Sequence, residues 1–87
     1  MILAVFRSRA HSLDYVEELK RHGVNASTML APKDVRIGCG GCVRFEEVNY
    51  ARAVALLRLG NYKSFKGFYK LEYVGGIPRV LLYTKEK

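Results

Sequence analysis

The chain has 87 residues, of which 49% are hydrophobic and 26% charged, a composition typical of one folded domain. No apolar run approaches the ~20 residues of a membrane-spanning helix, and Arg7 follows the apolar N-terminus too soon for a secretory signal. Fifteen Lys and Arg against eight Asp and Glu give a net charge of +7, which permits an acidic partner such as nucleic acid but also suits an ordinary soluble surface. We therefore predict a single cytoplasmic domain over residues 1–87, with no membrane partner.

The first third of the chain predicts a strand and a helix. The apolar run over residues 2–6 indicates a short buried strand. Ser8 is placed to cap a helix over residues 9–22, in which apolar residues recur at three-residue spacing. Basic residues close this helix and Gly23 follows them, which is a common pattern at helix C-termini.

The middle of the chain predicts two strands and a second helix. The stretch VNASTML over residues 24–30 indicates a second strand, which Pro32 closes, and residues 42–46 alternate between apolar and polar side chains. Asn49 is a candidate N-cap for a helix over residues 50–59, and Gly60 is placed to end it.

The C-terminal part predicts a tight β-hairpin about Gly75 and Gly76, a two-residue turn between apolar runs. Pro78 has no N–H for a ladder hydrogen bond, which favours an outer strand. Folding the chain about the turn pairs opposite charges on one face and sets apolar residues toward the core on the other. The predicted cross-strand pairs are Tyr69 with Leu82, Leu71 with Val80, and Glu72 with Arg79.

The resulting order, β-α-β-β-α-β-β, predicts an α+β fold. It is the ferredoxin-like β-α-β-β-α-β arrangement with an added C-terminal hairpin strand. We expect one antiparallel sheet with both helices on one face.

The only two cysteines, Cys39 and Cys42, lie three residues apart in the stretch IGCGGCVRF over residues 37–45. A cysteine acts as nucleophile, metal ligand or sulfur carrier in its thiolate form, and nearby cations lower its pKa. Two thiols at this spacing can also resolve a sulfenic acid or a persulfide. We predict an exposed, reactive Cys39, with Cys42 as its resolving or auxiliary thiol.

The residues around the pair suit a reactive thiol. Glycines leave the sulfur atoms unshielded and allow a partner to approach closely, and cations flank the pair in sequence. Cys42 and Arg44 are two positions apart, so they share one face of the predicted strand. The predicted supporting residues are Gly38, Gly40, Gly41, Lys33, Arg36 and Arg44.

Three other interpretations of the pair stay open. A thioredoxin-like CxxC is activated by the helix that follows it, whereas a strand follows here. A structural zinc site needs four ligands, but the chain adds only two distant histidines, His11 and His22, which we interpret as solvated helix residues. We therefore predict no metal and no cofactor. The third interpretation is that both cysteines are small residues in a tight turn.

The chain also resembles the family described as putative selenium/sulfur carrier protein-like, over most of residues 2–57. The family's Cys-Gly matches Cys39-Gly40, so the resemblance implies that Cys39 is the functional thiol and exchanges sulfur or selenium with a donor or acceptor protein. Lysine follows Pro32 where the family usually has arginine, and Cys42 and the second hairpin strand are additions to its pattern. The likeness lies in the opening strand ending in Phe6, in Ser8, and in LKRHGV (19–24), APK (31–33) and CGGCVRF (39–45).

A non-catalytic binding module is the alternative. The stretch KGFYKLEY over residues 66–73 partly matches an RNA-binding sheet pattern in which aromatic rings stack on bases, although it follows the second helix instead of preceding it. An ordinary outer sheet face or a homodimer contact explains the same residues. The predicted aromatic and cationic face, suited to single-stranded nucleic acid or a protein partner, consists of Phe68, Lys70, Arg79 and Tyr83.

The chain shows no Ser-His-Asp arrangement, phosphate loop or paired carboxylates that would indicate a conventional enzyme. The sequence therefore predicts a sulfur or selenium carrier, or a thiol-redox accessory protein, in preference to a stand-alone enzyme.

Overall fold

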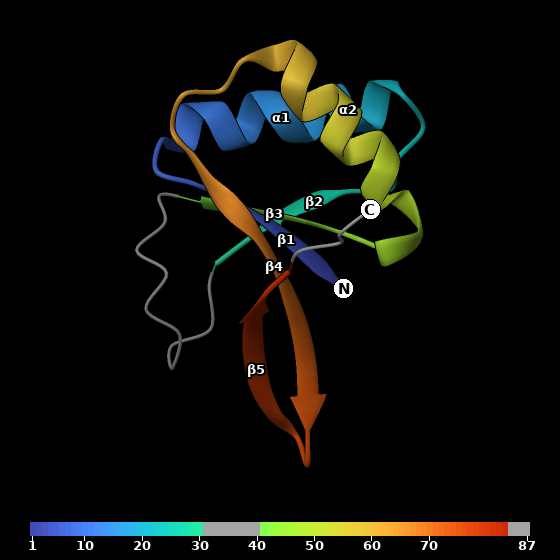
Figure 1. The fold of residues 1–87 in the computed structure, drawn as a ribbon, viewed down its shortest axis with the longest axis vertical. Helices are drawn as coiled ribbons and strands as arrows, with labels where there is room; N and C mark the ends of the chain where they lie inside the picture. The colour runs from blue at the N-terminus through green and yellow to red at the C-terminus, as the bar shows by residue number, and fades with distance from the viewer. Residues whose placement is uncertain (31–40, 84–87) are drawn as a thin grey trace.

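The computed structural model describes residues 1–30 and 41–83 of the chain. The elements follow the predicted order, with a short 3-10 helix added before the second α-helix (Figure 1). Neither described helix has the length and apolar character needed to span a membrane. In chain order the elements are β1 (Ile2–Phe6), α1 (Arg9–Arg21), β2 (Ser27–Met29), β3 (Gly41–Phe45), η1 (Glu47–Asn49), α2 (Tyr50–Gly60), β4 (Phe65–Val74) and β5 (Ile77–Leu82).

The five strands form one sheet in the order β2-β3-β1-β4-β5, and each neighbouring pair is antiparallel. The first four strands have the ferredoxin-like arrangement, with β1 between β3 and β4, and β5 is added beside β4. Both helices cover the same face of the sheet (Figure 1). The predicted fold class is therefore confirmed.

The main core lies between the helices and this face of the sheet. Alternate residues of β1 and β3 point into it, among them Phe6 and Phe45, and α1 contributes Tyr15 and Leu19. The Phe6 ring lies 5.3 Å from the ring of Tyr15 and 5.4 Å from that of Phe65, centroid to centroid. Such aromatic pairs add about 0.5–1.5 kcal/mol beyond the burial of their area. The contact with Tyr15 therefore stabilises α1 against the sheet, and the contact with Phe65 joins β1 to β4.

The ends of α1 follow from the residues predicted to form them. The Ser8 side chain accepts a hydrogen bond from the backbone N–H of His11 at 3.3 Å, which satisfies one of the exposed donors at the helix start. Gly23, with φ +81°, takes the left-handed conformation just beyond the helix.

The ends of α2 differ from the prediction. Asn49 makes no side-chain capping hydrogen bond, and the chain enters the helix through η1. The left-handed residue at the other end is Asn61, with φ 54°, and not Gly60. Gly60 has a packing role instead, because a Cβ there would lie 2.2 Å from the ring of Tyr62.

The β4–β5 hairpin has the predicted register. Gly75 and Gly76 both have positive φ, 59° and 82°, as a type I′ two-residue turn requires. Pro78 lies on β5, at the edge of the sheet, as predicted. The cross-strand pairs are Tyr69 with Leu82, Leu71 with Val80, and Glu72 with Arg79.

The helix-covered face of the hairpin is the opposite of the predicted one. Phe68 is 7% exposed and belongs to the main core, where its ring contacts that of Tyr50 at 5.1 Å. Tyr69 and Leu71 lie on the other face, and Tyr69 packs there against the buried Cys42 cluster. The prediction was wrong because period two separates the two faces of a strand without showing which one the helices cover.

Candidate functional site

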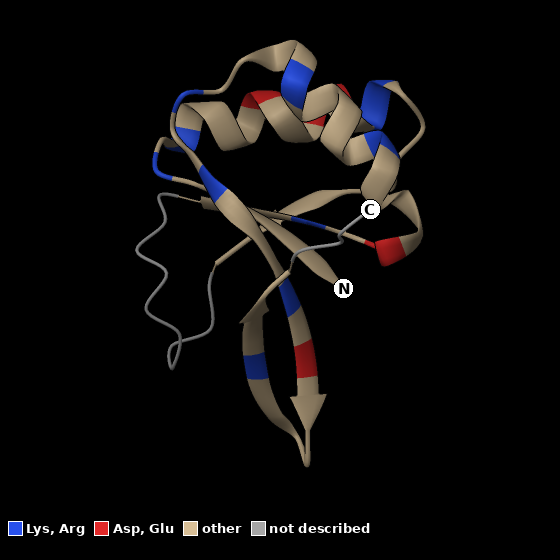
Figure 2. Ribbon diagram, in the orientation of Figure 1, with Lys and Arg blue, Asp and Glu red and all other residues tan. Residues whose placement is uncertain are grey.

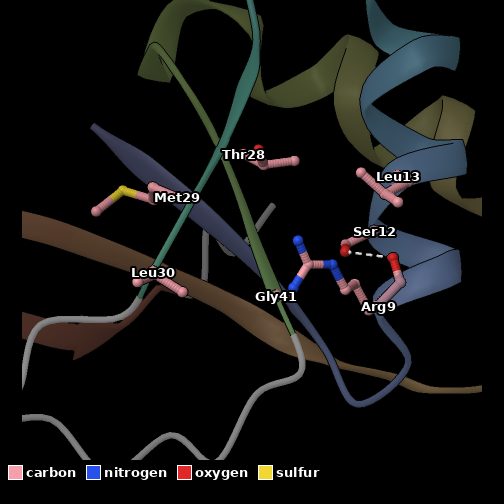
Figure 3. Close-up of a pocket in the computed structure, with 7 residues that line it drawn as sticks. All are labelled: Arg9, Ser12, Leu13, Thr28, Met29, Leu30 and Gly41. Atoms are coloured by element: carbon pink, nitrogen blue, oxygen red, sulfur yellow. Dashed lines mark hydrogen bonds between the residues drawn. The ribbon is translucent and has the colours of Figure 1, made fainter.

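The candidate site is a cavity of about 440 Å³ between the start of α1 and the adjoining ends of β2 and β3. Leu30 and Gly41, the described residues on either side of residues 31–40, both line it. Both ends of the cysteine-bearing segment therefore border the same cavity. The described residues that line it are Arg9, Ser12 and Leu13 from α1, Thr28, Met29 and Leu30 at the end of β2, and Gly41 from β3 (Figure 3).

Arg9 supplies positive charge to the cavity. It is the first residue of α1, and its side chain extends toward the end of β3 at Gly41 (Figure 3). Among the described residues, its guanidinium forms no ion pair. A guanidinium is permanently charged and carries five N–H donors. Arg9 can therefore bind an anionic group, a thiolate included, at this end of the sheet.

Gly41 lies where α1 approaches β3 closely. Ser12 is 1% exposed, and its hydroxyl donates a hydrogen bond to the Arg9 carbonyl oxygen at 2.8 Å. A Cβ on Gly41 would lie 2.6 Å from the Ser12 Oγ, so a larger residue here would displace the Ser12 hydroxyl. The absence of a side chain at Gly41 was predicted to let a partner approach closely. In the structure it lets Ser12 of α1 pack against this position.

Cys42 is buried in the sheet. Its exposed fraction is 0%, and it pairs with Met29 on β2 and with Val5 on β1. It lies on the face away from the helices, in a cluster with Val5 against which Tyr69 and Val80 pack. In this arrangement solvent does not reach the Cys42 thiol.

Among the described residues, the Arg44 side chain contacts Ser27 and Met1. Its Nε donates a hydrogen bond to the Ser27 Oγ at 2.9 Å, and its Nη1 lies 3.8 Å from the Met1 Sδ. It shares the face of Cys42, as predicted. Since strands rise about 3.3 Å per residue, Arg44 lies about 10 Å along β3 from Gly41. Of these two arginines, Arg9 is the one that lines a cavity together with Gly41.

The other residues predicted to form the thiol site lie outside the described residues, so the roles expected of them stay predictions. These are Cys39, Gly38, Gly40, Lys33 and Arg36.

The residues of the alternative binding face do not form an open stacking surface. Phe68 is buried in the core. The Tyr83 hydroxyl donates to Glu47 Oε2 at 2.7 Å, which raises the pKa of Tyr83 to about 12, and Lys70 Nζ lies 3.5 Å from Glu47 Oε1. Arg79 pairs across the hairpin with Glu72. Base stacking on Phe68 is therefore not supported.

Sequence reasoning missed Arg9 and Ser12, because the cavity joins segments that lie far apart in the chain.

His11 was predicted to be a solvated helix residue, but it makes contacts within the protein. Its Nδ1 lies 2.6 Å from the Ser64 Oγ, and its ring centroid lies 5.7 Å from that of Tyr62. His11 is half-buried, whereas His22 is exposed. Within the part of the chain that the structure describes, no three His, Cys, Asp or Glu residues are grouped to hold a metal ion.

Together these features define an α+β domain of ferredoxin-like topology in which Leu30 and Gly41, the described neighbours of the Cys39 segment, line a cavity with Arg9. The family model described as "Putative Se/S carrier protein-like" matches residues 1–70. The chain belongs to this family. The match ends within β4, so β5 is an addition to the matched part, as the sequence indicated. Comparisons with curated proteins and with solved structures give no match.

Proposed function

We propose that this protein carries a sulfur or selenium atom on Cys39 and transfers it between a donor and an acceptor protein. The observation that supports this proposal most strongly is that Leu30 and Gly41 both line the cavity that contains Arg9. Cys39 is two residues from Gly41 in sequence, and two residues of backbone reach at most about 7 Å. Membership of the carrier-like family supports the same chemistry.

In the loading step, the Cys39 thiolate attacks the terminal sulfur of a persulfide on the donor. An S–S bond to Cys39 forms as the donor's S–S bond breaks, and the electron pair of the broken bond leaves with the donor thiolate. The transferred sulfur keeps its proton, so no oxidant or reductant is consumed. In delivery, the acceptor thiolate attacks the same atom and releases Cys39 as a thiolate. A selenium atom in the terminal position would follow the same course.

Arg9 favours both steps in this proposal. Cys39 must be a thiolate to attack in loading, and it leaves as a thiolate in delivery. A guanidinium stabilises that anion, and among the described residues Arg9 is the cation that lines the cavity at the end of β3.

The resolving role predicted for Cys42 would be a slower second reaction. The Cys42 thiolate would attack the Cys39 sulfur of the persulfide, form a disulfide and release hydrosulfide. Because Cys42 is buried between β1 and β2, this reaction would require the Gly41 end of β3 to open. We place the protein in the reducing cytoplasm, where a disulfide formed in this way would be returned to thiols.

The test is the intact mass of the full chain after incubation with a low-molecular-weight persulfide, with no thiol reductant present. The proposal predicts a gain of one sulfur atom that a thiol reductant removes. The gain should persist in Cys42→Ala, which keeps the buried site apolar, and be absent in Cys39→Ser. Modification that persists in Cys39→Ser, or no modification of the wild type, would overturn it.

A further inference from the structure

A second cavity, of about 360 Å³, lies on the β4 side of the start of α1. The chain leading into β4 and the loop before α1 form its walls, and Lys and Arg gather at this end of the molecule (Figure 2). No Asp or Glu is present among the described residues that line it. The lining is Arg7, His11, Lys63, Ser64, Phe65 and Lys66.

Ser64 is held in this cavity by three contacts to the start of α1. The Arg7 backbone N–H donates to the Ser64 carbonyl at 2.9 Å, and the Ser8 N–H donates to the Ser64 Oγ at 3.2 Å. His11 Nδ1 lies 2.6 Å from the same Oγ. When Nδ1 carries its proton, the Ser64 oxygen accepts from both groups, and its own O–H is left to donate into the cavity.

Two of the cations around Ser64 are available to a ligand. Arg7 and Lys63 are exposed, and among the described residues neither side chain forms an ion pair or a hydrogen bond. Like charges gathered on one cavity repel one another, and an anion bound between them removes that repulsion. Charge-assisted hydrogen bonds from arginine and lysine to an oxyanion are also the stronger kind.

We propose that this cavity binds a tetrahedral oxyanion, either free or as the terminal group of a small phosphate monoester. Arg7 and Lys63 pair with its oxygens, and the Ser64 hydroxyl donates to it. A volume of about 360 Å³ lies at the small end of the ~300–1,000 Å³ of ligand pockets, which suits a small molecule better than an extended polymer. The site uses no residue of the cysteine segment and stands independently of the proposed carrier function.

The site lies near the proposed carrier site. Phe6 of β1 pairs with Gly41 on one side and with Phe65 on the other. Since neighbouring strands lie about 4.8 Å apart, Gly41 and Phe65 are separated by about 10 Å across the end of the sheet.

The test is a titration of the ¹⁵N-labelled full chain with inorganic phosphate, followed by amide chemical shifts, against potassium chloride at matched ionic strength. We expect saturable shifts at Ser8, His11 and residues 63–66 with phosphate alone. A small phosphate monoester, titrated in parallel, shows whether the extra group adds affinity. Shifts that do not saturate, or that chloride reproduces, would overturn the proposal.

Charge-matched variants separate a specific site from the general positive charge. Arg7→Gln/Lys63→Gln should weaken phosphate binding roughly tenfold, whereas Lys20→Gln/Arg58→Gln, which removes two exposed cations elsewhere, should leave it within about twofold. The amide spectrum shows that each variant is folded. The phosphate affinity of the single variant Lys63→Gln is measured as well, so that the test does not depend on the double variant alone. Equal effects of the two double variants, or binding of a single-stranded oligonucleotide without any binding of phosphate, would contradict the proposal.

Discussion

The Oγ of Ser12 occupies the space that a side chain on Gly41 would need. An ideal Cβ on Gly41 would lie 2.6 Å from this oxygen and 3.5 Å from the Ser12 Cβ. The first distance is a clash and the second is an ordinary contact. The hydroxyl alone therefore conflicts with a side chain at position 41, at the start of β3.

This relationship predicts a rescue. Gly41→Ala should lower the free energy of unfolding by about 1–3 kcal/mol, because the Ser12 hydroxyl must abandon its hydrogen bond or the helix must shift. Adding Ser12→Ala removes the clashing oxygen, so the double variant should recover most of that loss. Chemical denaturation of the two single variants and the double variant gives the coupling energy. Additive losses would show that the contact does not set this position.

The two cysteines should differ in reactivity. Cys42 is 0% exposed, so in Cys39→Ser it should react with a thiol reagent many-fold more slowly than the same thiol in denaturant, because only opened molecules react. Time-resolved labelling with a disulfide reagent, with and without guanidinium, measures the ratio. Labelling of native Cys42 at the rate of the unfolded chain would contradict the packing of this strand.

The hairpin turn should respond to backbone conformation alone. Gly75 and Gly76 have positive φ, and nothing lies within 4 Å of a Cβ built on either residue. Gly75→Asn should leave stability within about 0.5 kcal/mol, since asparagine accepts the left-handed region, whereas Gly76→Val should cost about 1–2 kcal/mol. Thermal unfolding of both variants compares them directly. Equal stability would argue against the type I′ turn.

Tyr15 should make stability fall at alkaline pH. Its hydroxyl donates to the Ala53 carbonyl at 2.7 Å, and burial raises its pKa well above the ordinary value of 10.0. Its contribution is therefore fully present below about pH 10, where the unfolded side chain is also protonated, and is lost progressively above that pH.

The matching variant is Tyr15→Phe. It should cost about 1 kcal/mol at pH 7 through the lost hydrogen bond and show a shallower decline above pH 10. Tyr73→Phe, at a residue that is 63% exposed, is the control and should change neither quantity. Denaturation at a series of pH values measures both the stability at pH 7 and its decline above pH 10. If Tyr15→Phe leaves that decline unchanged, Tyr15 is not its cause.

Local chemistry in the sequence was enough to predict the elements and the hairpin register. The Ser8 cap and the Gly75-Gly76 turn act over a few residues, so their effect can be predicted without the tertiary structure. The face of the hairpin could not be predicted in this way. By alternation Phe68 shares its face of β4 with Lys70 and Glu72, so the pattern favours the face of Tyr69 and Leu71 as the buried one. Only the position of the helices places Phe68 in the main core.

The candidate site was predictable only in part. The spacing of the cysteines drew attention to the segment that borders the cavity, but it did not show that Cys42 is buried or that Arg44 is bonded to Ser27. Arg9 and Ser12 reach Gly41 because α1 crosses the end of β3, which is a tertiary contact between segments about thirty residues apart. No local pattern encodes that contact.

The central claim is tested most directly by the rate at which Cys39 takes up sulfur from a low-molecular-weight persulfide, measured by intact mass at neutral pH in the Cys42→Ala background. Arg9→Gln should slow this transfer roughly threefold, since fewer molecules hold the thiolate while the remaining thiolate is more nucleophilic. Arg58→Gln, with the same change in net charge, should leave the rate unchanged. No transfer to Cys39, or equal rates in the two arginine variants, would contradict a carrier site at the Arg9 cavity.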